Sequence, residues 1–127
     1  MSEKHYLDVI ERVVYVLELS DYCFYIGQAQ KKSFDRRMKE HFDLTRKSRK
    51  SAWVKLHLAI SIIETSEYVG TVPEIEVFEN KKTIEYMRKY GASKVRGGYY
   101  TQPDYDEVRK CLKAHGYNVR KQVRISN

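Results

Sequence analysis

The chain has little cysteine and no long apolar segment. Its two cysteines, Cys23 and Cys111, are too few for a disulfide framework, and neither belongs to a CxxC pair. We expect both to be reduced thiols that pack as small hydrophobes. No run approaches the roughly 18 apolar residues that a membrane helix needs, and the N-terminus has no apolar signal core. We therefore expect an intracellular protein of the cytoplasm or nucleus, neither secreted nor embedded in a membrane.

The chain also has fewer acidic residues than basic ones. The 127 residues include 24 Lys and Arg against 17 Asp and Glu, which gives a net charge of +7. The excess is clustered, because residues 29–57 carry ten basic residues against three acids and residues 109–124 carry six against none. Such clustering is typical of a surface that binds a phosphate backbone. An ordinary solvated basic surface is the alternative, and an anionic membrane is disfavoured because no basic amphipathic helix has a broad apolar face.

The pattern predicts one α+β domain, residues 1–127, without an internal repeat or linker. Two runs rich in Val, Tyr, Ile and Phe, 12–18 and 23–28, read as a β-hairpin. A third, central strand is expected at 58–64, followed by a connection at 67–70. Residues 44–51 have no apolar periodicity and predict an exposed basic loop.

Three helices are expected. The first, within 33–42, begins at Ser33 and places Phe34, Met38 and Phe42 on one face. The second begins with capping-box spacing at 71–74 and ends before Gly91. The third covers about 103–115. Between the last two, residues 92–102 predict a loop in which consecutive glycines permit positive φ.

Polar side chains occupy unusual places on these elements. Tyr15 and Tyr25 lie inside apolar strands, where Phe would avoid the need for a hydroxyl partner, so their hydroxyls either reach solvent or serve a site. Arg37 and His41, four residues apart, emerge together at the edge of a buried helix face. Glu79 lies within the apolar arc of the second long helix. Such a carboxylate pairs with Arg or Lys, is protonated, or anchors a hard divalent cation.

These residues resemble the GIY-YIG nuclease superfamily over about residues 12–100. The matching positions are Tyr15, Tyr25, Ile26, Gly27, Arg37, His41 and Glu79. Small phage-type and large-DNA-virus-type members are similar also in a Ser-x-Trp motif at 51–53 and in the segments 86–91 and 95–98. Val13 stands where the family has its first glycine, and Lys94 stands near its usual Asn. Arg36 is the alternative to Arg37.

The resemblance implies a fold and a reaction. The fold is an α/β sandwich with a small three-stranded antiparallel sheet flanked by helices, followed by a C-terminal helix and basic tail at 101–127. The reaction is endonucleolytic hydrolysis of DNA phosphodiester bonds with one Mg²⁺ or Mn²⁺. A non-catalytic nucleic-acid-binding module on the same scaffold is the alternative, and a protein adaptor is a further one.

The resemblance also implies a role for each site residue. Glu79 holds the metal, and Arg37 stabilises charge in the transition state. Tyr15 is the expected general base, with its pKa lowered by neighbouring cations. Tyr25 hydrogen-bonds the phosphate or the water, and His41 supports either hydroxyl.

A set of DNA contacts completes these expectations. Six residues are expected to meet the nucleic acid: Gly27, Lys47, Arg49, Lys50, Trp53 and Arg96. Backbone contacts of this kind are sensitive to salt and do not read sequence. A packing role is the alternative for Trp53, and a plain turn is the alternative for the glycine pair after Arg96. A dimer or a partner protein would supply any sequence specificity.

Overall fold

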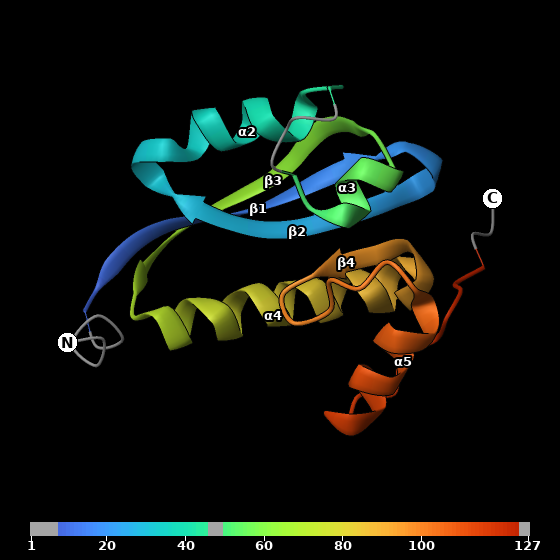
Figure 1. The fold of residues 1–127 in the computed structure, drawn as a ribbon. Helices are drawn as coiled ribbons and strands as arrows, with labels where there is room; N and C mark the ends of the chain where they lie inside the picture. The colour runs from blue at the N-terminus through green and yellow to red at the C-terminus, as the bar shows by residue number, and fades with distance from the viewer. Residues whose placement is uncertain (1–7, 46–49, 125–127) are drawn as a thin grey trace.

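A four-stranded sheet lies between two layers of helices in the computed structural model, which describes residues 8–45 and 50–124 (Figure 1). The strands are β1 (Ile10–Leu19), β2 (Cys23–Gln30), β3 (Ala59–Gly70) and β4 (Val95–Gly97). Their order is β3-β1-β2-β4, in which only the β2–β4 pair is parallel. The helices are α2 (Phe34–Phe42), α3 (Ala52–Leu56), α4 (Val72–Tyr90) and α5 (Tyr105–Ala114). Short 3₁₀ turns are η1 (Ser20–Tyr22), η2 (Lys31–Ser33) and η3 (Ala92–Lys94).

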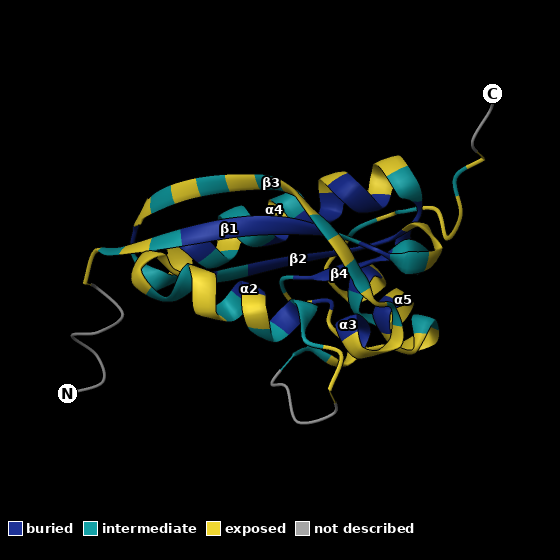
Figure 2. Ribbon diagram, turned by 90° about the horizontal axis from the view of Figure 1, so that it is seen from above, coloured by how far each residue is buried: buried dark blue, intermediate teal, exposed yellow. Residues whose placement is uncertain are grey.

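The β1–β2 hairpin forms the centre of the molecule and is buried on both faces (Figure 2). Because side chains alternate along a strand, Val14 and Val16 face α4 and α5, while Tyr15 and Leu17 face α2 and α3. Two apolar cores result, one on each side of the sheet. The expected α+β class and the hairpin are therefore confirmed.

Helix α4 begins and ends where its sequence predicts. Thr71 accepts from the Glu74 amide while the Glu74 carboxylate accepts from the Thr71 amide, so the capping box is present. Gly91 ends the helix with φ of 98°, a conformation that favours glycine. No described helix is both long enough and apolar enough to cross a membrane.

The third strand differs from its prediction in length and in place. Strand β3 continues through residues 67–70, which were expected to be a connection, because this segment pairs with the first residues of β1. Tyr68 also packs on Phe78, with ring centroids 4.9 Å apart. β3 lies at the edge of the sheet and leaves Ile60 59 % exposed, so the prediction of a central strand was wrong. The central strands are instead β1 and β2, whose residues are buried on both faces of the sheet.

The expectation of three strands was also wrong, because residues 95–97 form β4 where a loop was predicted. Gly97, with φ of 152°, lets this short strand approach β2 closely, since a side chain there would meet the Ile26 carbonyl. A three-residue segment that ends on the first glycine of a glycine pair has no recognisable strand pattern. Pairing with residues 24–26 creates the strand, and that pairing ends at Ile26.

Candidate functional site

The hairpin register brings Tyr15 next to Tyr25 across Gly27. Tyr15 pairs with Gly27 in the β1–β2 ladder, and the two tyrosine rings lie 6.3 Å apart. A Cβ added at Gly27 would lie 2.6 Å from the Tyr15 hydroxyl oxygen and 2.8 Å from the Tyr25 ring. Gly27 is therefore needed for space, because the Tyr15 ring lies across it.

Helix α2 places His41 against both tyrosines. The His41 Nε2 lies 2.7 Å from the Tyr15 hydroxyl oxygen, and the imidazole centroid is 5.5 Å from the Tyr15 ring and 5.4 Å from the Tyr25 ring. The side chain is only 1 % exposed, and its Nδ1 has no hydrogen-bond partner in the described part of the chain. Burial, with smaller effects of Arg37 and Lys50, lowers the His41 pKa to about 3. His41 is thus neutral at physiological pH.

Arg37, one turn before His41, lies half-buried beside the tyrosine hydroxyls. Its guanidinium is 3.3 Å from a Glu40 carboxylate oxygen and also lowers the pKa of Tyr15 and Tyr25 by its charge. Burial nevertheless outweighs this effect, so the pKa of each tyrosine is raised above its ordinary value. Arg37 thus acts in the expected direction, but loss of water around the phenol dominates without a metal, and a net lowering of the Tyr15 pKa by the metal and Arg37 together stays a prediction.

Glu79 reaches the same region from the opposite face of the sheet. Strand β4 pairs only with residues 24–26 of β2, so residues 27–30 have no strand partner on their outer edge in the described part of the chain. At this open edge the Gln28 amide donates to Glu79 Oε1 over 3.3 Å. The Glu79 charge also raises the pKa of Tyr15 and of Tyr25. Glu79 therefore lies within electrostatic range of the two tyrosines on the other face of the sheet.

The environment of Glu79 matches its expected partial burial. Burial raises its pKa to about 7, against a smaller lowering effect of Gln28 and of the Arg12 charge. Glu85, on the exposed side of α4, instead lies 3.7 Å from Lys82. Helix periodicity thus separated the two glutamates correctly.

The donor set around Glu79 suits one weakly coordinated hard cation. Within residues 8–45 and 50–124, no group of three or more His, Cys, Asp or Glu side chains is placed to hold a metal. A single carboxylate suits Mg²⁺, which binds through one or two carboxylates and keeps several waters. The residues present therefore fit a singly anchored Mg²⁺ or Mn²⁺ and do not fit a closed protein cage.

Two of the expected DNA contacts lie in the interior. Arg96 is 1 % exposed, and its guanidinium donates to the carbonyls of Ala92, Val95, Gln102 and Pro103. It stacks 4.2 Å from the ring of Trp53, which is 4 % exposed and donates from Nε1 to the Phe24 carbonyl. The structure thus contradicts surface DNA contacts by Arg96 and by Trp53. The Arg96 guanidinium holds the backbone before and after β4 together, and the Trp53 ring packs this region against β2.

The remaining expected contacts have different outcomes. Lys47 and Arg49 lie outside the described residues. Lys50 donates to the Asp43 carbonyl, and its charge lowers the pKa of His41, so it borders the site. Gly27 is buried beneath the tyrosines, and any role toward DNA depends on the space that it provides.

Three residues at the site were not predicted. Gln28 contacts Glu79, Ser51 contacts the Tyr25 hydroxyl and lowers that pKa, and the Arg12 charge acts on Glu79. Side chains alternate along β2, so Gln28 points toward α4, on the opposite face from Tyr25 and Gly27, and strand periodicity alone could have indicated this.

Comparison of the chain with known protein families, with curated proteins and with solved structures finds no match. The function is therefore argued from this site.

Proposed function

We propose that the chain is a metal-dependent endonuclease of the GIY-YIG type, which hydrolyses DNA phosphodiester bonds. One observation carries the proposal: two tyrosines, an arginine and a histidine lie together on one face of the sheet, and a half-buried glutamate from the other face, bonded to Gln28 at the open edge of β2, acts on both tyrosines through its charge. The exposed basic residues Lys32 on η2 and Arg36 and Lys39 on α2 favour a polyanionic substrate.

Glu79 is the residue that would hold the metal. When bound there, Mg²⁺ or Mn²⁺ would supply Lewis-acid polarisation of the scissile phosphate and stabilise the leaving oxygen. Arg37 adds a fixed positive charge next to both tyrosine hydroxyls, where negative charge grows on the phosphate oxygens. Because Arg37 is half-buried, its charge is less screened than that of a surface arginine.

Proton transfer follows from the contact between Tyr15 and His41. The raised pKa of Tyr15 keeps the phenol protonated, and in the tautomer that carries its proton on Nδ1, neutral His41 accepts at Nε2. As the water oxygen bonds to phosphorus, the bond from phosphorus to the leaving oxygen breaks and solvent protonates that oxygen. The water proton passes to the Tyr15 oxygen while the Tyr15 proton passes to His41, whose pKa the negative charge of the bound phosphate raises above its ligand-free value. Tyr15 thereby acts as the base without first existing as a free phenolate, and Tyr25 hydrogen-bonds the phosphate or the water.

A plasmid-nicking assay tests the proposal. We expect the protein to convert supercoiled DNA to open-circular or linear DNA with Mg²⁺ or Mn²⁺ and to stop when EDTA is added. Glu79→Gln should abolish conversion. Glu85→Gln, an isosteric change on the exposed side of the same helix, should leave it intact. Equal nicking by wild type and Glu79→Gln would reject Glu79 as the metal anchor.

A non-catalytic nucleic-acid-binding module is the second candidate. It is favoured by Val13, a buried valine at the position of the family's first glycine. The module would bind duplex DNA in a salt-dependent manner and leave plasmid intact with either metal. A protein adaptor would show no DNA binding even at low salt, where phosphate contacts are strongest.

A further inference from the structure

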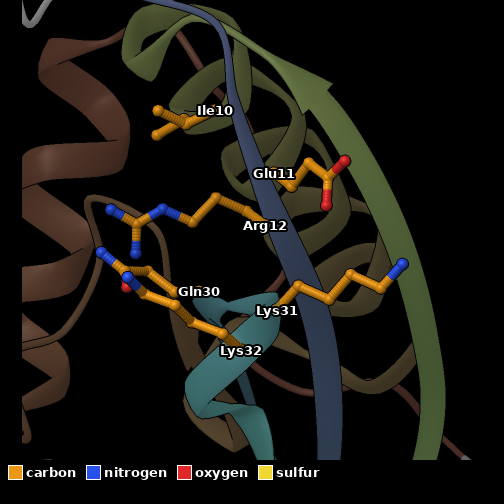
Figure 3. A pocket seen from close by; sticks show the side chains of 6 residues that line it. All are labelled: Ile10, Glu11, Arg12, Gln30, Lys31 and Lys32. Atoms are coloured by element: carbon orange, nitrogen blue, oxygen red, sulfur yellow. The ribbon is translucent and has the colours of Figure 1, made fainter.

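A polar pocket of about 300 Å³ lies beside the first residues of β1 and the end of β2. Figure 3 shows that Arg12, Gln30 and Lys32 point into the same space, with the Gln30 amide and the Lys32 amine below the Arg12 guanidinium. Glu11 and Lys31 also line the pocket but point to the other side of β1 (Figure 3). Lys31 lies 3.4 Å from Glu67 there.

One buried polar atom that lines this space lacks a hydrogen-bond partner. The Nε of Arg12 is buried and has no hydrogen-bond partner in the described part of the chain. A buried donor without a partner is costly, and most such groups in native proteins have a partner, a water or a ligand. A planar guanidinium together with an amine and an amide donor matches the oxygens of a phosphate group. The side of the pocket that these three residues share has no carboxylate among its lining residues.

The pocket adjoins the candidate active site. Arg12 and Gln30 are directly paired in the ladder, and they lie on the same sheet face as Gln28, which contacts Glu79. Gln30 follows Gln28 by two positions along the strand, which is about 7 Å. This length is close to the distance in space between neighbouring phosphates of one DNA strand, which exceeds the rise per nucleotide because the backbone winds around the helix axis.

We propose that Arg12, Gln30 and Lys32 form a second phosphate subsite, which binds the DNA backbone phosphate next to the scissile one. The inference rests on the proposed nuclease function for the identity of the polyanion, whereas the capacity to bind phosphate rests on the pocket itself. Arg12 makes a bidentate contact, Lys32 supplies a second charge, and Gln30 donates through its amide. The subsite orients the duplex before chemistry occurs.

Nuclear magnetic resonance in EDTA tests the subsite without cleavage. The Nε–Hε signal of Arg12, assigned by its loss in Arg12→Lys, is followed during titration with a short DNA duplex and, separately, with inorganic phosphate at matched ionic strength. We expect saturable shifts with both ligands. Shifts with phosphate alone would limit the pocket to small free anions and overturn the backbone assignment, and an unmoved signal with both would overturn the subsite.

Fluorescence anisotropy with the same duplex measures the contribution to affinity. Arg12→Gln and Lys32→Gln should each weaken binding by about tenfold and lower the slope of log K against log salt by about 0.9. Lys31→Gln removes the same charge at the neighbouring position, where the amine points away, and should change neither quantity. Lys32 is exposed, so its variant tests the subsite even if Arg12→Gln disturbs β1.

The two proposals fail in different ways. A protein that shows the Arg12 shifts and the affinity losses yet never nicks DNA would retain the subsite and reject the nuclease. A protein that nicks DNA but binds it equally well in wild type, Arg12→Gln and Lys32→Gln would retain the nuclease and reject the subsite.

Discussion

The hydroxyl oxygen of Tyr15 lies 2.7 Å from Nε2 of His41, and the chain contains a second pair with the same spacing. Tyr100, equally buried, has its hydroxyl oxygen 2.7 Å from Nδ1 of His115. The two pairs differ in their surroundings, because His41 is buried next to Arg37 whereas His115 is exposed. The Tyr100 pair is therefore a built-in control for the chemistry proposed for the Tyr15 pair.

Removal of the Tyr15 hydroxyl should separate catalysis from folding. We expect Tyr15→Phe to lower the rate of DNA cleavage by about 10² to 10⁴, because the proton relay from water to His41 is lost. DNA affinity should stay near the wild-type value, and the loss of stability should be about 1 kcal/mol. Tyr100→Phe removes a matched hydroxyl and should leave cleavage unchanged. Equal cleavage by Tyr15→Phe and wild type would move the base to Tyr25 or His41.

The buried neutral His41 should make the protein less stable in acid. Its pKa is lowered to about 3 in the folded protein from an ordinary 6.5, so between these values the unfolded chain binds more protons. The contribution of His41 to the free energy of unfolding is fully present above pH 6.5. It is lost as pH falls toward 3, by at most about 1.4 kcal/mol per pH unit.

His41→Gln should remove this contribution, and urea unfolding between pH 4 and pH 7 measures it as a difference from wild type. The difference in unfolding free energy between the two proteins isolates His41. Glu79 makes stability fall as pH rises, but it does so in both proteins and cancels. His57→Gln, at an imidazole 3.4 Å from Asp21, is the control. Parallel curves for wild type and His41→Gln would contradict a buried neutral imidazole.

Replacing Glu79 should stabilise the protein at alkaline pH while abolishing its activity. Burial raises the Glu79 pKa to about 7, so the favourable contribution of its protonated form is present below pH 4.5 and is lost as pH rises through 7. Glu79→Gln should therefore be about 1 to 3 kcal/mol more stable than wild type at pH 8 and nearly equal to it at pH 4. Thermal unfolding at both pH values, with Glu85→Gln beside it, is the measurement. A Glu79→Gln protein less stable than wild type at pH 8 would show that the carboxylate is favourably paired.

Metal binding should follow the ionisation of the same carboxyl. Below about pH 7 the affinity for Mn²⁺ should rise about tenfold per pH unit, because the cation displaces one proton from Glu79, and above it the affinity should level off. Electron paramagnetic resonance of Mn²⁺ measures the bound fraction directly. Affinity that is independent of pH between 5 and 8, or retained in Glu79→Gln, would place the metal elsewhere.

The space at Gly27 should be sensitive to a single methyl group. Gly27→Ala places a Cβ 2.6 Å from the Tyr15 hydroxyl oxygen, so the ring must move. We expect a loss of about 1 to 3 kcal/mol in urea unfolding and slower cleavage, with the Tyr15–His41 contact displaced. Ser33→Ala at the start of α2, where no side-chain cap bond forms, should change both by much less. Unchanged stability in Gly27→Ala would show that the tyrosines move aside freely.

The local sequence pattern by itself determined several elements of the fold and one feature of the candidate site. The Val- and Tyr-rich runs around Tyr15 and Tyr25 predict the hairpin, the Thr71–Glu74 capping box predicts the start of α4, and helical periodicity predicts the partial burial of Glu79. Each of these depends on residues within one or two turns or one strand, so neighbours in the chain are sufficient to specify it.

Only the tertiary structure decided the remaining features. β4 exists because residues 95–97 pair with a strand some 70 residues earlier, and the same pairing buries Arg96 against Trp53. The direction of the Tyr15 pKa shift depends on how much water α2 and α3 exclude from the phenol, and the Arg12 pocket depends on the turn η2 returning beside β1. Burial and desolvation are sums over segments distant in sequence, and a local pattern contains no measure of them.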